Sequence, residues 1–352
     1  MTLLKIDKGF EFRLEPVNLP RVLIISPALA NANNGNWQTA WRWSRMLASK
    51  FQVTIAPKWP SNPPGGEPFD VMLALHARRS ADSIAAWARA RKATGDAPRL
   101  AVVLTGTDLY RDIQTNVAAQ ASLGFAKQLV VLQELGPLAL PEAMRHKARV
   151  IFQSTSTRQQ LQKSNRHLRV VMVGHLRDEK SPQTLFEAAR LLTNHPDILI
   201  DHIGEPLDTK LGKQAQATAL ACPNYRWLGG LAHEATRRRI QRAHVLVHAS
   251  VMEGGAHVVM EAVCCGTPVL ASRIDGNVGM LGEKYPGYFS HGDARALADL
   301  LLRCRADQAM PGQRRSGNFY LQLQTRCEQR APLFAPQKEQ AALVKLVRDL
   351  LK

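Results

Sequence analysis

Short apolar runs alternate with longer segments of helical periodicity along the first half of the chain. The runs rich in β-branched and other apolar residues are RVLIISPA (21–28), FQVTIAP (51–57), DVMLALH (70–76), LAVVLTG (100–106), QLVVLQE (128–134) and RVIFQS (149–154). Such runs are typical of buried strands. Helical spacing is seen between them, for example in 37–49 and 80–93. Strands that alternate with helices predict a mostly parallel sheet covered on both faces.

The same pattern starts again after the polar stretch 155–167. Its strand candidates are RVVMVGH (169–175), ILIDHIG (198–204), YRWLGG (225–230), HVLVHAS (244–250) and PVLAS (268–272), with helices between them and a last one at 296–306. We therefore expect two α/β domains in tandem. An N-terminal extension (1–19) precedes the first domain (20–160), the second domain is 161–335, and a C-terminal amphipathic helix (336–352) is expected to pack back toward the first domain.

The chain is strongly basic. It has 46 Lys and Arg against 29 Asp and Glu, a net charge of +17, which attracts nucleic acid, anionic membranes and phosphorylated small molecules alike. The densest basic run, 237–239, lies in a helical segment and is typical of a solvated helix face. Since basic and aromatic residues do not interleave as in nucleic-acid-binding proteins, no nucleic-acid partner is expected.

Cysteine usage and hydropathy narrow the class further. The five cysteines form no CxxC pair and no metal-ligand spacing, so we expect reduced structural thiols and no metal site. No apolar run approaches the roughly 18 residues that span a bilayer, and the first residues lack the apolar core of a signal peptide. We therefore expect a cytoplasmic protein without integral membrane association.

The loops that follow the strands of the second domain carry candidate chemistry, because ligands of open parallel sheets bind at the carboxyl ends of the strands. In HLRDEKSP (175–182), His175, Arg177 and Lys180 come just before a helix expected to begin at 181–182. Cations beside a helix N-terminus favour an anion, since the free N–H groups and the helix dipole act in the same direction.

A second informative loop lies in VMEGGAHVVMEAVCCGTPVLAS (251–272). Glu253 precedes the Gly254–Gly255 pair, and Glu261 lies in an apolar helix that ends before Gly266 and Pro268. Glu261 follows the expected helix start near residue 255 by roughly 9 Å at the rise of an α-helix. This is about the distance from a diphosphate to the ribose of one nucleotide. The spacing therefore indicates Glu261 for the ribose and Glu253 for the group that the diphosphate carries.

These residues resemble the E-x7-E signature of retaining-type GT-B glycosyltransferases. The resemblance implies two tandem Rossmann-like domains whose parallel sheets face an interdomain cleft, with a UDP-sugar donor on the second domain. His175 stands where the family has Arg, so we expect Arg177 to take that contact. Arg177, Lys180 and Glu253 are the implied catalytic residues. The implied donor contacts, including the base pocket in YRWLGGL and the glycine loop in RIDGNVGMLGE, are Gly174, His175, Leu228, Gly229, Leu231, Gly254, Gly255, Ala256, His257, Glu261, Gly276 and Asn277.

The acceptor is expected on the first domain, where the sequence departs from the common GT-B pattern. An Asn-rich loop replaces the usual Gly-Gly loop, and LTGTDLYRD resembles the family's HGTDL element with Thr105 in place of its His. Arginine side chains follow two strands, and their forks suit a tetrahedral oxyanion better than a neutral sugar. The predicted acceptor residues are Asn34, Gly35, Asn36, His76, Arg78, Arg79, Thr105, Thr107 and Arg111.

A narrower resemblance accounts for these arginines. SPALANANNGNWQTA, LHARRSADSIAAW, VVLTGTDLYRDIQT and MVGHLRDEKSPQT are similar to the selenosugar synthases of bacterial selenoneine biosynthesis. The resemblance implies that UDP-N-acetylglucosamine or UDP-glucose reacts with selenophosphate to give a 1-selenosugar and UDP. It also implies a functional link to an enzyme that produces selenophosphate. Selenium needs no general base, and Lys180 with Arg177 can neutralise departing UDP, so no cofactor or metal is expected.

One alternative stays open at this point. A GT-B transferase that forms an ordinary O-glycoside on a sugar or lipid acceptor would show the same donor signature. The two hypotheses differ only in the lining of the acceptor side.

Overall fold

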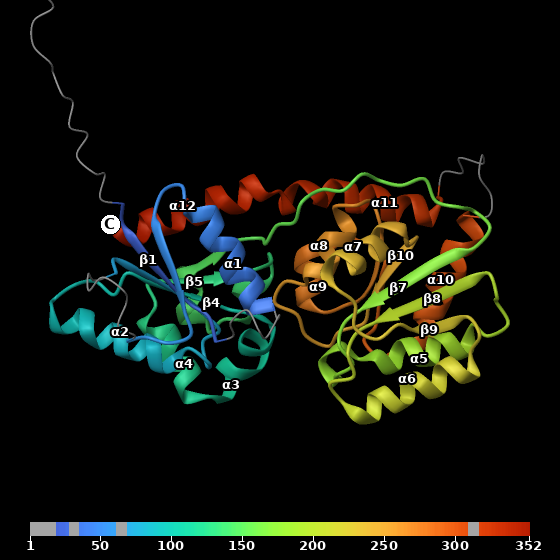
Figure 1. Cartoon of the computed structure of the whole chain (residues 1–352), viewed down its shortest axis with the longest axis horizontal. Helices are drawn as coiled ribbons and strands as arrows, with labels where there is room; N and C mark the ends of the chain where they lie inside the picture. Colours follow the sequence, from blue (N-terminus) through green and yellow to red (C-terminus); the bar gives the residue numbers. More distant parts are fainter. Residues whose placement is uncertain (1–18, 28–34, 61–68, 309–316) are drawn as a thin grey trace, which may run out of the picture.

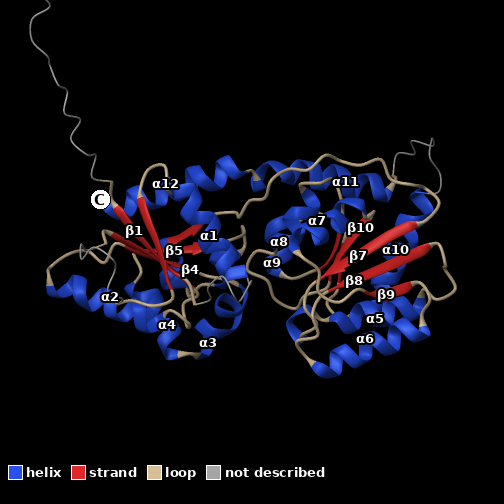
Figure 2. Cartoon of the chain, viewed as in Figure 1, coloured by secondary structure: helices blue, strands red, loops and turns tan. Residues whose placement is uncertain are grey.

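The computed structural model describes residues 19–27, 35–60, 69–308 and 317–352. Figure 1 shows two α/β lobes side by side, with the C-terminal helices running along one edge of both. Each lobe contains one parallel sheet with helices on its two faces (Figure 2). The prediction of two tandem Rossmann-like domains is confirmed.

The first sheet has six parallel strands in the order β2-β1-β3-β4-β5-β6. All five residues of β3 are buried, as expected for a central strand covered on both faces. The strands are β1 (Arg21–Ile25), β2 (Gln52–Ala56), β3 (Val71–Leu75), β4 (Leu100–Val103), β5 (Gln128–Val131) and β6 (Ala148–Val150). The helices of this domain are α1 (Gly35–Leu47), α2 (Ala81–Ala93), the π-helix η2 (Asp108–Asp112), α3 (Ile113–Thr115), α4 (Val117–Phe125) and the 3-10 turns η3 (Gly136–Ala139) and η4 (Glu142–Lys147).

The second sheet also has six parallel strands, in the order β12-β11-β10-β7-β8-β9. Its strands are β7 (Leu168–Val173), β8 (Ile198–Ile203), β9 (Tyr225–Trp227), β10 (Val245–His248), β11 (Val269–Ser272) and β12 (Tyr288–Phe289). Its helices are η5 (Asp178–Lys180), α5 (Pro182–Leu191), α6 (Thr209–Ala221), α7 (His233–Arg242), α8 (His257–Val263), α9 (Asp275–Leu281), α10 (Ala294–Gln308), α11 (Phe319–Arg330) and η6 (Ala331–Phe334).

The strand orders locate the expected ligand sites. In the second sheet β7 lies between β8 and β10, so the connections leave it in opposite directions at the β7/β10 boundary. In the first sheet the corresponding boundary lies between β1 and β3. Open α/β sheets bind ligands at such a switch point, at the carboxyl ends of the strands. The loops after β7 and β10 carry Lys180 and Glu253, and the loop after β3 carries Arg78 and Arg79.

The C-terminal helix α12 (Pro336–Leu351) belongs structurally to the first domain. Leu343, Leu346 and Leu350 join the core on the face of the first sheet that also contains Trp43 of α1. Glu339 is 1% exposed. Its carboxylate accepts hydrogen bonds from the Arg42 guanidinium at 3.0 Å and from Trp43 Nε1 at 2.6 Å. These contacts attach α12 to the first domain, whereas α11 and η6, which precede α12 in the chain, pack on the second domain.

Three features of the fold were not expected from the sequence. The segment RIDGNVGMLGE, predicted as a glycine loop, contains helix α9. Helix α9 forms despite two glycines because it is buried between the domains, and packing overrides its low helix propensity. Helix α11 and the π-helix η2 were also missed. Within the described residues, none of the helices combines the length and apolarity needed to cross a bilayer.

Candidate active site

The loops after β7 and β10 bring together two of the predicted catalytic residues. The ammonium Nζ of Lys180 lies 2.5 Å from Oε1 of Glu253. Both side chains are largely buried, with 18% and 13% of their area exposed. A Cβ on Gly174 would lie 3.3 Å from the stem of Lys180, so the absence of a side chain at the end of β7 leaves room for the lysine.

A histidine that was not among the predicted site residues also faces Glu253. Nε2 of His248, the last residue of β10, lies 3.4 Å from Glu253 Oε1. Burial alone would raise the pKa of Glu253, but Lys180 and His248 together hold it well below its usual value. Glu253 is therefore a carboxylate at neutral pH, with Lys180 and His248 in contact with its Oε1.

The predicted donor residue Asn277 lies behind this histidine. Asn277 is fully buried. Its Oδ1 lies 2.9 Å from His248 Nδ1, and its Nδ2 donates to the carbonyl oxygen of Ser272 at 2.9 Å. Its neighbour Gly276 packs against the backbone of Glu253, because a Cβ there would lie 2.0 Å from the Glu253 carbonyl oxygen. The start of α9 thus supports Glu253 and His248 from behind.

The second glutamate, Glu261, lies in α8 and is 6% exposed. Its Oε1 lies 2.7 Å from Nε2 of His233 and 3.7 Å from Nε of Arg237, both of which belong to α7. The hydrogen bond to Glu261 raises the pKa of His233. Helix α8 begins at His257, slightly later than predicted. Nε2 of His257 is buried and has no hydrogen-bond partner among the described residues. Burial lowers the pKa of His257 to about 3.

The predicted base pocket lies at the carboxyl ends of β8 and β9. Leu228 N–H donates to the carbonyl oxygen of His202 at 2.8 Å, and Gly229 follows with a φ of +67° that favours glycine. Leu231 is 37% exposed. His175 Nδ1 accepts a hydrogen bond from Glu205 N–H at 3.2 Å. Burial lowers the pKa of His175, so this ring is neutral at neutral pH.

The two domains touch at the loop that carries Glu253. A Cβ on Gly254 would lie 2.6 Å from the carbonyl carbon of Thr105, and one on Gly106 would lie 3.1 Å from Gly254 N. A Cβ on Gly255 would meet the Leu132 side chain at 2.8 Å. Glycine is therefore required for the two predicted loops to approach each other, and the predicted donor and acceptor residues lie close together there.

The acceptor loop is organised around a buried aspartate. Asp108 is fully buried. Its carboxylate accepts hydrogen bonds from Thr105 N–H and Oγ1, both at 2.7 Å, and from Ala77 N–H at 2.9 Å. His76 lies 3.8 Å from the same carboxylate, is 2% exposed and has a φ of +73°. Burial lowers the pKa of His76. Asp108 therefore fixes the loops after β3 and β4 relative to each other.

Two of the three predicted arginines converge on a second aspartate. Nε of Arg78 lies 2.9 Å from Asp112 Oδ2, and Nε of Arg111 lies 3.4 Å from Asp112 Oδ1. Thr107 Oγ1 lies 3.4 Å from His76 Nε2, next to this cluster. Arg79 is exposed at the surface beside Arg78. The structure thus places a group of cations at the end of the first sheet.

This cluster connects to the donor side through Glu179 of η5. Nη1 of Arg111 lies 3.5 Å from Glu179 Oε1, and Nε of Arg177 lies 3.9 Å from Glu179 Oε2. Arg111 belongs to the first domain and the other two residues to the second. The predicted catalytic residue Arg177 and the predicted acceptor residue Arg111 therefore share one carboxylate across the domain boundary.

The remaining acceptor prediction concerns the start of α1. Asn34 lies outside the described residues. Gly35 and Asn36 form the first turn of α1. The carbonyl oxygen of Gly35 accepts a hydrogen bond from Thr39 Oγ1 at 2.8 Å, and Thr39 in turn accepts one from Gln153 Nε2 at 2.6 Å. The first turn of α1 is thereby tied to the segment that leaves the first domain.

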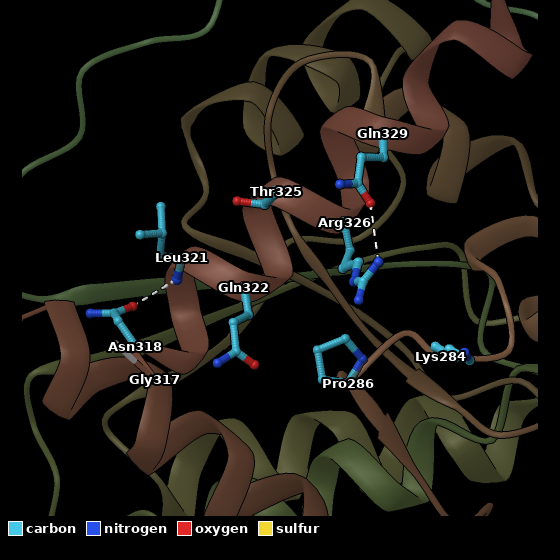
Figure 3. A pocket seen from close by; sticks show the side chains of 9 residues that line it. All are labelled: Lys284, Pro286, Gly317, Asn318, Leu321, Gln322, Thr325, Arg326 and Gln329. Carbon is cyan, nitrogen blue, oxygen red and sulfur yellow. Dashed lines mark hydrogen bonds between the residues drawn. The ribbon is translucent and has the colours of Figure 1, made fainter. Parts of the chain in front are cut away.

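One surface cavity of about 490 Å³ lies away from these residues, along α11 (Figure 3). Asn318 in its wall accepts a hydrogen bond from Leu321 N–H at 2.7 Å, which caps α11. Arg326 and Gln329 bond to each other. Three of its polar side chains, Asn318, Arg326 and Gln329, are thus engaged at or within α11. None of the predicted site residues that the structure describes lines this cavity. Among the described residues, no three His, Cys, Asp or Glu side chains form a metal cluster.

Comparison with known proteins agrees with this arrangement. Residues 153–318 match the family Glycosyl transferases group 1. The matched residues include both glutamates, Lys180 and His248.

Several solved structures are similar to most of the chain. Sucrose-phosphate synthase from Thermosynechococcus elongatus superposes with a TM-score of 0.70 at 17% identity, covering 94% of this chain and 99% of that one. HepE from Anabaena, in complex with UDP and glucose, gives 0.65 at 15% identity, with 94% and 100% covered. S. aureus TarM gives 0.58 at 14% identity and covers 79% of this chain, which spans 56% of TarM. The protein has the GT-B fold.

Proposed function

We propose that the protein is a glycosyltransferase that takes the sugar of a UDP-sugar. Support comes from the group 1 domain, from the GT-B fold and from structural neighbours solved with UDP. In this proposal Glu261 accepts hydrogen bonds from the ribose and Glu253 contacts the donor sugar. The base lies at Leu228, Gly229 and Leu231.

The diphosphate is assigned to the cations in front of the second sheet. Lys180 and Arg177 neutralise the charge that develops as UDP departs, together with backbone N–H groups of 254–257. His175 is neutral, so it contributes a hydrogen bond rather than charge. In this proposal the Lys180 ammonium, which is paired with Glu253, contacts the phosphate next to the sugar.

We further propose that the acceptor is selenophosphate and that selenium attacks C1 of the sugar. The observation that carries this is the convergence of Arg78 and Arg111 on Asp112, beside the loop that touches Gly254. Guanidinium groups can hold phosphate oxygens in a bidentate manner while the selenium faces the sugar. A selenium–carbon bond forms, the bond from C1 to the UDP oxygen breaks, and UDP keeps its electron pair. Selenium is then still bonded to phosphorus, and hydrolysis of that bond by water releases phosphate and gives the 1-selenosugar. Selenophosphate must be supplied by an enzyme that makes it.

One observation favours the alternative, an O-glycosyltransferase. Asp112 is 5% exposed and already balances Arg78 and Arg111. Its Oδ2 has no hydrogen-bond partner among the described residues, although it is ion-paired with Arg78. A carboxylate with a free lone pair can accept the proton of an acceptor hydroxyl. The two hypotheses therefore assign opposite roles to the same cluster: an anion site or a base.

The test compares acceptors. The protein is incubated with UDP-N-acetylglucosamine or UDP-glucose and either selenophosphate or a panel of alcohols and sugars, and UDP release is measured. The proposal expects release with selenophosphate. Release with an alcohol alone would establish the O-glycoside alternative.

Substitutions then test the arginines. Arg79→Ala and Arg111→Ala should raise the KM for selenophosphate strongly and leave that for the UDP-sugar nearly unchanged. Lys in either place should restore little, because it lacks the bidentate fork. Arg89→Ala, an exposed arginine farther along α2, is the matched control. Parallel changes in both KM values, or none, would exclude the oxyanion site.

A further inference from the structure

His248 occupies a defined position behind Glu253. It is the last residue of β10 and is 1% exposed. Its Nδ1 faces Asn277 Oδ1 at 2.9 Å, and its Nε2 faces Glu253 Oε1 and Ser250 Oγ, each at 3.4 Å. The ring is therefore held on both nitrogens at the switch point of the second sheet.

The hydrogen-bond network fixes which nitrogen carries a proton. The carbonyl oxygen of Ser272 can only accept, so the group of Asn277 that lies 2.9 Å from it must be the amide NH2. Oδ1 of Asn277 therefore faces His248, and Nδ1 of His248 must donate to it. A neutral ring protonated on Nδ1 would present a lone pair at Nε2 to the Glu253 carboxylate. The Ser250 hydroxyl can donate to Nε2 or accept from it, whereas the contact with the Glu253 carboxylate is attractive only when Nε2 is protonated as well.

We propose that His248 is a positioning residue for Glu253: as an imidazolium, it shares Oε1 with Lys180 and turns Oε2 toward the donor sugar. This rests on the proposed function, in which Glu253 contacts the donor sugar. Oε1 is bound from both sides. The side-chain contacts that Glu253 makes with described residues all involve Oε1, so Oε2 is the oxygen left to a ligand.

The polar groups around this pair come from η5, α8, α9 and the loop after β10, and two of them, Lys180 and His257, are titratable. Lys180 of η5 faces Glu253 directly, and His257 of α8 lies close enough for Glu253 to raise its pKa slightly against the larger effect of burial. Asn277 of α9 and Ser250 contribute neutral hydrogen bonds. Because His257 is neutral at ordinary pH, Lys180 and His248 are the cations that hold Glu253.

The first experiment reads the proton itself. Imidazole 15N shifts of the unliganded protein are recorded near neutral pH and assigned by comparison with the His248→Gln variant. We expect His248 to carry protons on both nitrogens. A ring with a bare Nδ1, or one neutral at Nε2 while Glu253 is ionised, overturns the inference. This measurement needs no substrate, so it stands even if the proposed reaction is wrong.

The second experiment is kinetic. His248→Gln should lower kcat for UDP-sugar consumption by about 10- to 100-fold, because a misplacement of the order of 1 Å costs up to that much. Binding of UDP, which lacks the sugar, should change by less than about 2-fold. The pH dependence of kcat should differ between the wild type and His248→Gln, because only the wild type has an ionisable side chain at this position.

His244, which lies just before the same strand, offers a matched control. His244 precedes β10 at its opposite end, is 2% exposed and is hydrogen-bonded through both ring nitrogens. His244→Gln should lower stability while leaving kcat and the pH profile intact. If both variants lower only stability, His248 is structural and the inference fails. If the wild type neither binds UDP nor consumes a UDP-sugar, the proposed function fails instead.

Discussion

The carboxylate of Glu253 and the ammonium of Lys180 lie 2.5 Å apart, although 73 positions separate them in the sequence. They meet because β7 and β10 are neighbours in the second sheet, so the loops that follow them begin at the same edge. Each residue compensates the other's charge in a largely buried position. Removal of one partner therefore affects the state of the other.

Lys180→Met should destabilise the protein by about 1–3 kcal/mol, because the buried Glu253 carboxylate then lacks its charged hydrogen-bond partner. The double variant Lys180→Met/Glu253→Gln should recover most of that stability, since no uncompensated charge remains. Denaturant unfolding of the wild type, both single variants and the double variant measures the coupling. Strictly additive effects would mean that the two groups do not interact in solution.

Glu261→Gln should weaken UDP binding by about 1–3 kcal/mol, because the ribose loses a charged hydrogen-bond partner. Glu253→Ala should instead change the discrimination between donor sugars. Calorimetric titration with UDP, and competition between UDP-glucose and UDP-N-acetylglucosamine, separate the two roles. UDP affinity that is unchanged in a folded Glu261→Gln protein would remove this residue from the nucleotide site.

The pair of His233 and Glu261 should make stability depend on pH. The pKa of His233 is raised by its hydrogen bond to Glu261, so the pair's contribution is complete below the unfolded pKa of about 6.5. It is lost as pH rises through the higher folded pKa. Because 65% of the His233 side chain is exposed, the effect should be small. Melting temperatures of the wild type and His233→Gln should differ at pH 5.5 and converge near pH 9; a constant difference would contradict the assignment.

Gly276→Ala should reduce both activity and stability. A Cβ at this position would lie 2.0 Å from the Glu253 carbonyl oxygen, so the loop that carries Glu253 must move. Gly124→Ala is the control, since a Cβ there meets nothing within 4 Å and alanine favours the helix α4. Thermal unfolding and UDP-sugar turnover of the two variants test this; equal behaviour would show that the loop adapts.

Activity should survive EDTA. Lys180 and Arg177 can neutralise the departing diphosphate without a metal ion. The check is UDP release before and after chelation, with Mg²⁺ and Mn²⁺ added back. A strict requirement for either ion would mean that the diphosphate site described by these two residues is incomplete.

The sequence was most informative where apolar runs and loop glycines carry the signal. The strands were predicted because a short, wholly apolar run such as that of β3 is typical of a buried strand. Lys180 and Glu253 were predicted from the rule that ligands bind in the loops that follow the strands. Helix α9 was missed because two glycines argue against a helix, whereas its burial between the domains decides otherwise.

The histidine partners were missed for a different reason. His248 lies near the end of a predicted strand (244–250), so the same rule could have found it, but its position depends on Asn277, which only the fold brings near. Likewise, the arginines were predicted to gather, but Asp112 between them was not. Its position depends on the π-helix η2, a conformation without a clear local sequence signal.

The chain crosses between the domains twice, at 151–167 and at 331–336, and Figure 1 shows both crossings along the same edge of the molecule. They are also bonded to each other, since Thr155 N–H donates to the carbonyl oxygen of Phe334 at 3.2 Å. We expect these two bonded connections to form a hinge. The domains would then rotate about the axis of the hinge, while sliding and twisting between them are opposed. When the domains rotate apart, Gly254 would separate from Thr105 while Thr155 and Phe334 stay bonded. When they close, the proposed donor and acceptor loops would return to the same relative position.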